Sequence, residues 1–342
     1  MSRFNCLVFG LGQVGRMVCK TLLDEGVVIA GVYSRASHVG EDLGEVLGQA
    51  KAGIVVRPAG EFRARAGEAD IALFFTTSYL GDLLGEARQC LEQGIDVLTI
   101  AEDALYPWHH SPELARQLDE AARRGGATLL GTGVNDVAMV HLPAVLGAFT
   151  TGVRRIEVEC TGNFGRFGAK TLEGMPLGLD QAGYDAWLAA AASAEGPQQA
   201  SITGQSLEAL LAMTGLQAAA PLDIELQPAW TSSTLVVPAL DMQIAAGSTS
   251  GIVEIARAST RQGVEIEMRL VGKVFESHDE EYLQVDITAS HSMSLRVSPM
   301  PGVEATSALV VSRIADVLAA EPGLQSCDRL PCARLRVLQP AV

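Results

Sequence analysis

The sequence lacks several features that mark other classes of protein. No apolar run approaches the ~18 residues of a membrane-spanning helix, and Met1 leads directly into a strand pattern, without a secretory leader. Basic residues are few and scattered, with 25 Lys and Arg against 40 Asp and Glu and a net charge of -15. We therefore expect a cytoplasmic protein that binds neither nucleic acid nor a membrane.

The six cysteines also lack a metal-binding pattern. Their spacing matches no metal-site motif, and Cys6 and Cys19 fall on the apolar faces of the elements expected around them. Reduced thiols are expected in a cytoplasmic protein. No metal site is predicted.

Residues 4–15 join a buried strand pattern to a glycine-rich turn and a helix start. The apolar run ends at Gly10, and Gly12 and Gly15 follow at the G-x-G-x-x-G spacing, before apolar residues recur with helical period. In a dinucleotide site these glycines make the turn, admit the pyrophosphate and permit close helix–strand packing, and the helix N-terminus holds the phosphates. The alternative is a glycine turn that only packs. The expected cofactor residues of this loop are Gly10, Leu11, Gly12, Gln13, Val14 and Gly15.

The first half of the chain alternates apolar runs with helical patterns. Further strands are predicted at 27–33, 54–57, 70–75, 96–100 and 128–130, and helices at 79–93 and 112–124. Continuous apolar strands alternating with helices are typical of a parallel, doubly wound sheet. We therefore predict an α/β fold with a Rossmann domain over residues 1–150, whose ligand lies outside the carboxyl ends of the strands.

Beyond about residue 150 the apolar pattern changes to period two. The segments with this alternation are 156–160, 264–270 and 283–288. The pattern indicates a mixed, largely antiparallel sheet with one face covered. With helical patterns at 180–194 and 206–214, residues 151–300 are predicted to form an α+β domain. Residues 301–342 contain a helix that is expected to pack back on the Rossmann domain.

The residues after the second and fourth strands bear on the cofactor. Ser34 and Arg35 stand where NAD sites usually carry an acid for the ribose 2′-OH. Ser34 can donate to a phosphate and Arg35 can pair with it, which favours NADP over the alternative, NAD. A solvated loop charge is the other interpretation of Arg35. Thr76 and Thr77 are expected, from position alone, to contact the ribose or the nicotinamide amide.

Glu102 comes directly after the fifth apolar run, at the expected carboxyl edge of the sheet. A carboxylate beside a nicotinamide can accept a proton from an amine, stabilise an iminium and orient water. Ala101, just before it, is assigned to the cofactor site. The alternative is that Glu102 or Asp103 only opens the following helix. His109 and His110 are the second candidates for acid–base chemistry.

Two segments carry a resemblance to a known family. They are Ile100-Ala101-Glu102-Asp103-Ala104-Leu105-Tyr106-Pro107-Trp108 and Gly131-Thr132-Gly133-Val134-Asn135. Both are similar to segments of the 2,4-diaminopentanoate dehydrogenases and related amine dehydrogenases, in the wider superfamily of dihydrodipicolinate reductase. The stretch from 301 to 331 fits the same family, so the resemblance spans nearly the whole chain. The resemblance implies that Glu102 is catalytic. It also implies a Rossmann domain plus an α+β domain that carries the substrate pocket and a homodimer contact.

Some segments depart from the family pattern. The family continues the Gly-Thr-Gly-x-Asn turn with Pro-Gly-Phe, whereas this chain has Asp136-Val137-Ala138, and residues 163–168 also differ. Both stretches are expected to face substrate. His109-His110 is not followed by the lysine of the dihydrodipicolinate reductase signature, so that reaction is not expected.

The sequence therefore predicts an NADP-dependent oxidoreductase that interconverts a primary amine with a ketone or aldehyde plus ammonia. The expected substrate residues are Tyr106, Trp108, Asn135, Asn163, Phe164, Arg166 and Phe167. The aromatic residues among them suit a core equally well. Arg166 or Lys170 is the candidate for a substrate carboxylate, and a solvated loop charge is the other interpretation of each. The alternatives are an NADPH-dependent reductase of a preformed cyclic imine or enamine, and a non-catalytic NADPH-binding sensor.

Overall fold

The computed structural model describes residues 4–193 and 201–336, and the chain divides into two compact units. The first unit comprises residues 1–137 and 303–342, and the second comprises residues 138–302. The units thus divide at 137, earlier than the expected boundary at 150. Residue 194 of the expected helix 180–194, and the end of the C-terminal segment, lie outside the described residues.

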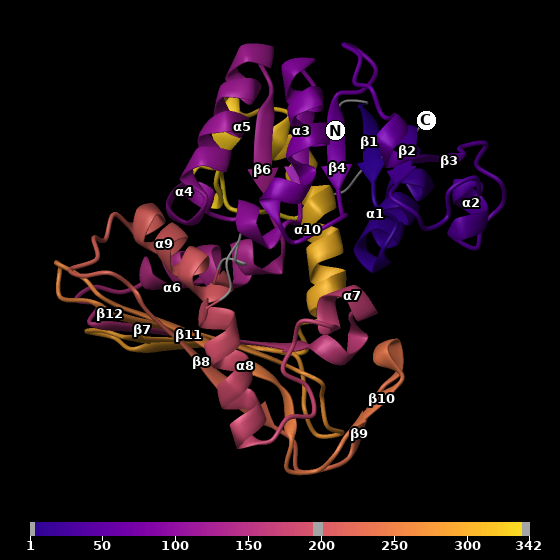
Figure 1. Cartoon of the computed structure of the whole chain (residues 1–342). Helices are drawn as coiled ribbons and strands as arrows, with labels where there is room; N and C mark the ends of the chain where they lie inside the picture. The colour runs from indigo at the N-terminus through magenta and orange to yellow at the C-terminus, as the bar shows by residue number, and fades with distance from the viewer. Residues whose placement is uncertain (1–3, 194–200, 337–342) are drawn as a thin grey trace. The chain divides into compact units, whose positions relative to one another are not determined.

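A seven-stranded parallel sheet forms the centre of the first unit (Figure 1). Its strands are β1 (Asn5–Phe9), β2 (Val28–Ser34), β3 (Val56–Pro58), β4 (Ile71–Phe74), β5 (Asp96–Thr99), β6 (Thr128–Gly131) and β15 (Gly323–Gln325). Their order is β15-β6-β5-β4-β1-β2-β3, so the winding reverses between β1 and β4, which is where such sheets bind dinucleotides. The predicted doubly wound parallel sheet is confirmed.

Helices cover both faces of this sheet because its strands are apolar on both sides. Leu7 and Phe9 of β1 pack in the cluster that includes α3 and α5, whereas Cys6 and Val8 pack in the cluster that includes α1 and α10. These helices are α1 (Gln13–Asp24), α3 (Leu80–Glu92), α5 (Pro112–Gly125) and α10 (Gly302–Val317). Each fully buried Leu or Phe side chain contributes about 1.5–3 kcal/mol to folding.

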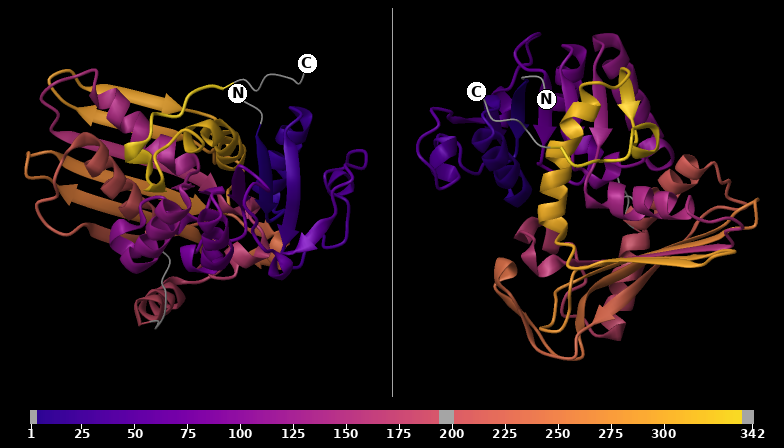
Figure 2. Two further views of the ribbon diagram at one scale, coloured as in Figure 1. Left: turned by 90° about the horizontal axis from the view of Figure 1, so that it is seen from above. Right: turned by 180° about the vertical axis from the view of Figure 1, so that it is seen from behind.

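A six-stranded sheet dominates the second unit (Figure 2). Its strands are β7 (Arg155–Asn163), β8 (Asp223–Trp230), β11 (Thr249–Ser259), β12 (Glu265–Lys273), β13 (Leu283–Thr288) and β14 (Met293–Val297). The order is β14-β13-β7-β12-β11-β8, in which β7 and β12 run parallel and the other neighbours antiparallel. The prediction of a mixed, largely antiparallel sheet is confirmed.

The period-two pattern of β7 corresponds to alternating burial of its side chains. Ile156, Val158 and Cys160 are buried, while Glu157 and Glu159 between them are half-exposed. Two longer helices accompany this sheet, α8 (Gln181–Ser193) and α9 (Ile202–Thr214). The second begins earlier than the predicted 206 because Ser201 caps it, its hydroxyl accepting a hydrogen bond from the Gly204 N–H at 2.8 Å.

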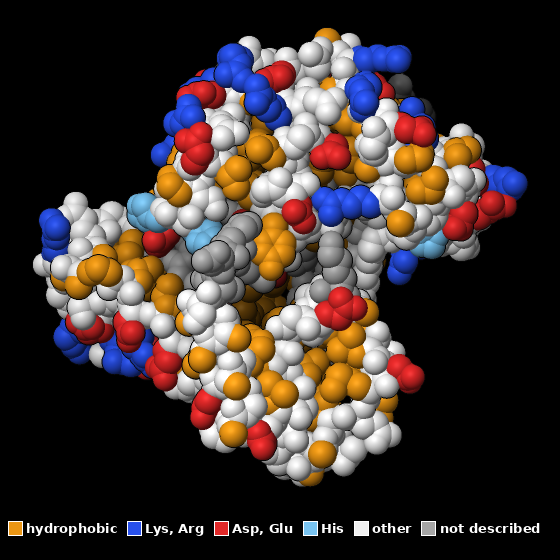
Figure 3. All heavy atoms as spheres, in the orientation of Figure 1, with side chains coloured by type: hydrophobic (Ala, Val, Ile, Leu, Met, Phe, Trp, Pro, Cys, Tyr) orange, Lys and Arg blue, Asp and Glu red, His pale blue; other side chains and the backbone are white. Residues whose placement is uncertain are grey.

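Short elements complete the fold. They include α2 (Leu43–Val46), α4 (Pro107–His110), α6 (Leu142–Gly147), α7 (Ala169–Leu172), β9 (Leu235–Val237), β10 (Met242–Ile244) and the 3₁₀ turns Glu102–Ala104 and Phe164–Arg166. None of the described helices combines the length and hydropathy that a membrane crossing requires. On the face shown in Figure 3, Lys and Arg side chains lie among Asp and Glu side chains.

Candidate active site

The glycine turn follows β1 and leads into α1. Gly10 has a φ of +94°, and its N–H donates to the Tyr33 carbonyl oxygen at 2.8 Å. A Cβ on Gly15 would lie 2.2 Å from the Gly10 carbonyl oxygen, so only glycine permits α1 to approach β1 this closely. A Cβ on Gly12 meets no atom within 4 Å, which leaves room for a pyrophosphate against bare backbone.

The first turn of α1 suits an anion. Gly12 is the N-cap, no side chain among the described residues caps this 12-residue helix, and its first turn holds no acid. Leu11 is buried, Val14 is half-buried and Gln13 is exposed. The N–H groups and the helix dipole favour negative charge here, so these residues fit the phosphates of a dinucleotide.

The end of β2 places Ser34 and Arg35 in different surroundings. Ser34 is buried, with its hydroxyl oxygen 3.1 Å from that of Ser37. Arg35 is half-exposed, its Nη2 donates to the Asp82 carbonyl oxygen at 2.9 Å, and its Nη1 lies 3.8 Å from the Asp82 carboxylate. Arg35 is therefore held against the first turn of α3, and a 2′-phosphate would compete with Asp82 for it.

Thr76 and Thr77 follow β4 at the same edge of the sheet. The Thr76 methyl carbon lies 3.1 Å from the position that a Cβ on Gly10 would take, so this side chain adjoins the glycine turn. The Thr77 hydroxyl donates to Asp82 Oδ2 at 3.0 Å. Thr77 thus adjoins the carboxylate that also approaches Arg35.

Glu102 and Asp103 are neighbours after β5 but differ in burial. Asp103 is 5% exposed, and its Oδ2 accepts a hydrogen bond from the Leu80 N–H at 3.3 Å, at the start of α3. Asp103 is therefore the acid that accepts a hydrogen bond from the N-terminus of α3. Glu102 is half-buried at the carboxyl edge of the sheet, directly after β5.

The turn that carries Glu102 is fixed at both ends. Before it, the Ala101 N–H donates to Thr99 Oγ1 at 3.0 Å, which bends the chain away from β5. At its end, the Ala104 carbonyl oxygen would lie 2.2 Å from a Cβ on Gly131, so β6 needs glycine at this contact. These two contacts fix the backbone from which the Glu102 side chain extends.

Tyr106 and Trp108 differ in their surroundings. Tyr106 is half-buried, and its ring centroid lies 6.1 Å from that of His109. Trp108 packs against the core cluster of α3 and α5, and its Nε1 donates to Ser326 Oγ at 3.5 Å. His109 and His110 are exposed. The contacts of Trp108 are those of a packing residue.

The turn after β6 carries Asn135 and is held by a buried network. Asp136 is 0% exposed, accepts from Thr132 Oγ1 at 2.8 Å and pairs with Arg313, also 0% exposed, at 2.9 Å. Burial lowers the pKa of Arg313, but the carboxylates of Asp136 and Asp316 outweigh this effect and leave the pKa raised. The expectation that Asp136 faces substrate is therefore wrong, because its carboxylate is engaged inside the first unit. Asn135 is half-buried.

The remaining predicted substrate residues belong to the second unit. Asn163 Oδ1 accepts from the Gly165 N–H at 3.0 Å, which caps a 3₁₀ turn. Phe164 is 8% exposed within the apolar cluster of this unit, and its ring centroid lies 5.0 Å from that of Phe167. Phe164 is thus a core residue, as the alternative interpretation of the aromatic residues expects.

Arg166, the candidate for a substrate carboxylate, already has an acid nearby. Its Nη1 lies 3.6 Å from a Glu281 carboxylate oxygen, and the other Glu281 oxygen accepts from the Asn163 N–H at 3.0 Å. A substrate carboxylate would compete with Glu281 for Arg166. The side chain of Lys170 lies outside the described residues.

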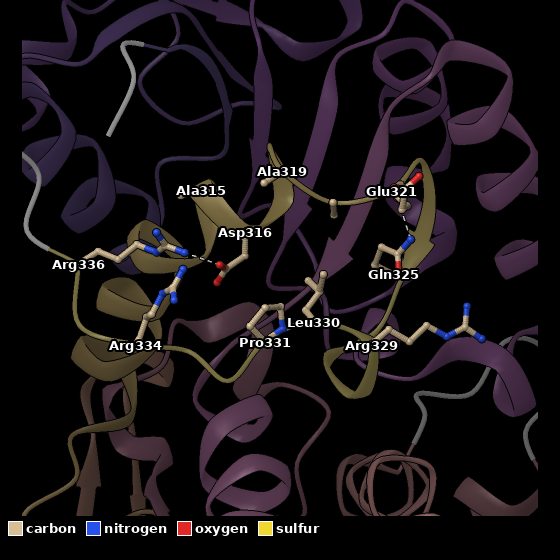
Figure 4. A pocket seen from close by; sticks show the side chains of 11 residues that line it. Ala315, Asp316, Ala319, Glu321, Gln325, Arg329, Leu330, Pro331, Arg334 and Arg336 are labelled. Carbon is tan, nitrogen blue, oxygen red and sulfur yellow. Dashed lines mark hydrogen bonds and ion pairs between the residues drawn. The ribbon is translucent and has the colours of Figure 1, made fainter.

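A cavity of 430 Å³ opens in the first unit near the end of α10 (Figure 4). It is lined by Ala315, Asp316, Ala319, Ala320, Glu321, Gln325, Arg329, Leu330, Pro331, Arg334 and Arg336. In Figure 4, Arg336 reaches the Asp316 carboxylate. The cavity contains none of the residues predicted to bind cofactor or substrate, so the candidate active site remains at the sheet edge.

Three residues that contact the predicted site residues or their supports were not predicted from the sequence. Asp82 stands in the first turn of α3, where acids are favoured anyway, and this hides its contact with Arg35. Thr99 ends an otherwise apolar strand, and a hydroxyl there is a usable signal. Arg313 is a charge in the apolar stripe of α10, a pattern that predicts a buried partner.

Known proteins resemble this chain in sequence and in fold. No protein-family model matches the sequence. The chain is 24% identical to 2,4-diaminopentanoate dehydrogenase of Acetoanaerobium sticklandii, with 98% of this chain and 95% of that protein aligned. It is 31% identical to an amine dehydrogenase structure from Mycobacterium smegmatis, with a TM-score of 0.89 and coverage of 99% of this chain and 98% of that one.

A more distant structure shares the fold alone. UDP-N-acetylglucosamine 3-dehydrogenase from Acidithiobacillus ferrooxidans is 14% identical, with a TM-score of 0.55 over 96% of this chain and 93% of that one. The mycobacterial structure, by contrast, matches in both sequence and fold over nearly its full length. The resemblance carried by the Glu102 segment is confirmed, and the chain belongs to the amine dehydrogenase family.

Proposed function

We propose that the protein is an NADP-dependent amine dehydrogenase that interconverts a primary amine with a ketone or aldehyde plus ammonia, with Glu102 as its base. The similarity to an amine dehydrogenase and to 2,4-diaminopentanoate dehydrogenase supports the reaction class. The observation that carries the proposal is the placement of Glu102, half-buried at the sheet edge that also bears the glycine turn. The neighbouring Asp103 is engaged by α3, so it does not compete for this role.

The cofactor assignment rests on the ends of β1, β2 and β4. Gly12 and the first turn of α1 would face the pyrophosphate, and Arg35 would pair with a 2′-phosphate. Ser34 stands where an NAD site carries its acid, so a free 2′-OH has no carboxylate partner there. When bound, the dinucleotide supplies a hydride acceptor for the carbon that bears the amine.

Glu102 has three tasks in the oxidative direction. As a carboxylate it accepts a proton from the substrate ammonium, which frees the nitrogen lone pair that assists hydride departure. Loss of the hydride leaves an iminium, whose positive charge the carboxylate stabilises. Having released its proton to solvent, Glu102 then deprotonates the attacking water, and the resulting carbinolamine breaks down to the carbonyl product and ammonia.

The substrate side of the site is the less constrained part of the proposal. The proposed contacts in the first unit are Tyr106 and Asn135. Asn163, Arg166 and Phe167, in the second unit, stay predictions from the sequence. Trp108 and Phe164 leave the predicted set because their contacts are with core residues. The homodimer and the cytoplasmic location stay predictions.

An assay of NADPH oxidation with ketones and aldehydes, with and without ammonium, tests the proposal. We expect NADPH to be consumed only when a carbonyl compound and ammonium are both present. Equal consumption of a preformed cyclic imine without ammonium would contradict the proposal and support the imine reductase. NADPH binding without turnover of any amine or carbonyl compound would instead support the sensor.

A further inference from the structure

We infer that Arg313 of α10 is a positioning residue for Glu102, acting through Asp136, Thr132 and Thr99. These residues all belong to the first unit and form a continuous series of hydrogen bonds. The inference rests on the proposed function, because it assigns the series a role in setting the direction of the catalytic carboxylate.

The series begins at a fork between two fully buried groups. Arg313 Nη2 lies 2.9 Å from Asp136 Oδ1, and Arg313 Nε lies 3.2 Å from Asp136 Oδ2. The guanidinium also donates to the Pro331 carbonyl oxygen and lies 3.4 Å from Asp316. Two parallel N–H···O contacts fix the angle of the carboxylate as well as its position, which a single charge would not.

Thr132 carries this geometry to the end of β5. Its hydroxyl donates to Asp136 Oδ2 at 2.8 Å, and its backbone N–H donates to the Thr99 carbonyl oxygen at 2.9 Å. A second tie to α10 lies nearby, where the Val134 N–H donates to Thr306 Oγ1 at 3.1 Å. The turn after β6 is therefore held by α10 on one side and by β5 on the other.

Thr99 connects the end of β5 to Ala101, the residue before Glu102. Its hydroxyl accepts from the Ala101 N–H at 3.0 Å, at the point where the chain leaves β5. The same hydroxyl donates to the Phe74 carbonyl oxygen at 3.4 Å. Thr99 is thus contacted by Thr132 at its carbonyl and by Ala101 at its hydroxyl, and the direction in which Glu102 leaves the strand follows from it.

Stability alone does not account for the buried pair. Removing two charges from water offsets most of their attraction, so apolar residues of similar volume stabilise a core about as well. An ion pair differs from an apolar pair in its directionality. Asp136 lies at the end of the turn that adjoins β5. The direction of its hydrogen bonds therefore affects the backbone that leads to Glu102.

Two variants at Thr132 test the series of hydrogen bonds at the link between Asp136 and β5. Thr132→Val removes the hydroxyl that reaches Asp136 and leaves the Arg313 pair intact, whereas Thr132→Ser keeps the hydroxyl. We expect Thr132→Val to lower kcat about 10- to 100-fold, as a small misplacement of a catalytic group does, with the NADPH dissociation constant and Tm close to wild type. Thr132→Ser should restore kcat. Loss of kcat in both variants, or in neither, overturns the inference.

A double variant tests Arg313 itself without leaving Asp136 as a buried charge that has lost its partner. The double variant Asp136→Leu/Arg313→Met removes both charges together, so the fold is expected to persist. We expect the same loss of kcat as in Thr132→Val at a Tm close to wild type. Wild-type kcat in this folded double variant overturns the role of Arg313.

Hydrogen exchange separates this inference from the proposed function, because it needs no substrate. The amides of residues 100–105 should exchange faster in Thr132→Val than in Thr132→Ser or wild type. If wild type turns over no amine, the proposed function fails, and the exchange rates still show whether Thr132 orders this segment. Equal exchange in all three proteins overturns the inference.

Discussion

Gly15 lies so close to Gly10 that a Cβ on Gly15 would stand 2.2 Å from the Gly10 carbonyl oxygen. Gly12, in the same motif, has no atom within 4 Å of its Cβ position. One glycine therefore serves the packing of α1 on β1, and the other leaves room for the proposed pyrophosphate. The two roles can be separated by substitution.

Gly12→Val should abolish NADPH binding and leave the fold intact. A Cβ at this position meets no protein atom within 4 Å, but a branched side chain occupies the space that the pyrophosphate needs. Titration calorimetry and circular dichroism check the two halves of this expectation. The matched control is Gly15→Val, which should lower Tm or prevent folding because its side chain meets backbone. NADPH binding by Gly12→Val at wild-type affinity would refute the pyrophosphate assignment.

Arg35→Ala should remove most of the preference for NADP over NAD. A charge-assisted contact contributes about 1.5–3 kcal/mol, roughly 10- to 150-fold in affinity. Because Arg35 is half-exposed and already held by Asp82, we expect the lower end of this range. The measurement is the ratio of the NADP and NAD dissociation constants.

Two further variants sharpen the Arg35 test. Asp82→Asn removes the competing carboxylate and should raise the affinity for NADP. Arg88→Ala removes an equal charge from the exposed side of α3, where Arg88 pairs with Glu92, and should leave the ratio unchanged. A wild-type protein that binds both cofactors equally would contradict the assignment.

Asp96→Asn should stabilise the protein at neutral pH. Burial and the nearby Asp70 carboxylate raise the pKa of Asp96 to about 6, although the Thr128 N–H that donates to it opposes the shift. The pKa of Asp96 is thus higher in the folded state than in the unfolded state. Its contribution to stability is therefore fully present at a pH below the unfolded pKa and is lost as the pH rises through about 6. Because solvent screens this partly exposed group, the gain in the free energy of unfolding at pH 7 should be only about 1 kcal/mol.

Melting temperatures of Asp96→Asn and wild type between pH 4 and pH 8 check this expectation. The difference should be small at the acidic end and grow as the pH passes through about 6. Asp24→Asn is the control, because hydrogen bonds from Lys20 and Gln49 lower the pKa of that exposed acid. A difference for Asp96→Asn that does not change with pH would contradict the account.

Much of the fold was predictable because burial leaves a periodic mark on the sequence. Strands buried on both faces read as continuous apolar runs, and strands buried on one face alternate. β15 was not predicted, because a three-residue strand has no period of its own and forms only by pairing with β6. The start of α9 at Ile202 was missed because it depends on the cap at Ser201.

The placement of the candidate site residues was predictable where it follows from their position after a strand. The glycine turn and Glu102 come directly after strands, and parallel strands carry such residues to one edge. Asp136 was not predictable in this way, because its partner Arg313 lies 177 residues further along. Phe164 likewise became a core residue through contacts that no local pattern records.

Turnover of Glu102→Gln is the most direct test of the central claim. Glutamine keeps the size and hydrogen bonding but removes the base and the charge, so kcat should fall at least about 10²- to 10⁴-fold. The NADPH dissociation constant and Tm should stay near wild type. Asp103→Asn, the neighbouring control, should lower Tm through its contact with α3 and keep kcat largely intact. A kcat for Glu102→Gln within about tenfold of wild type would contradict the account and direct attention to His109 and His110.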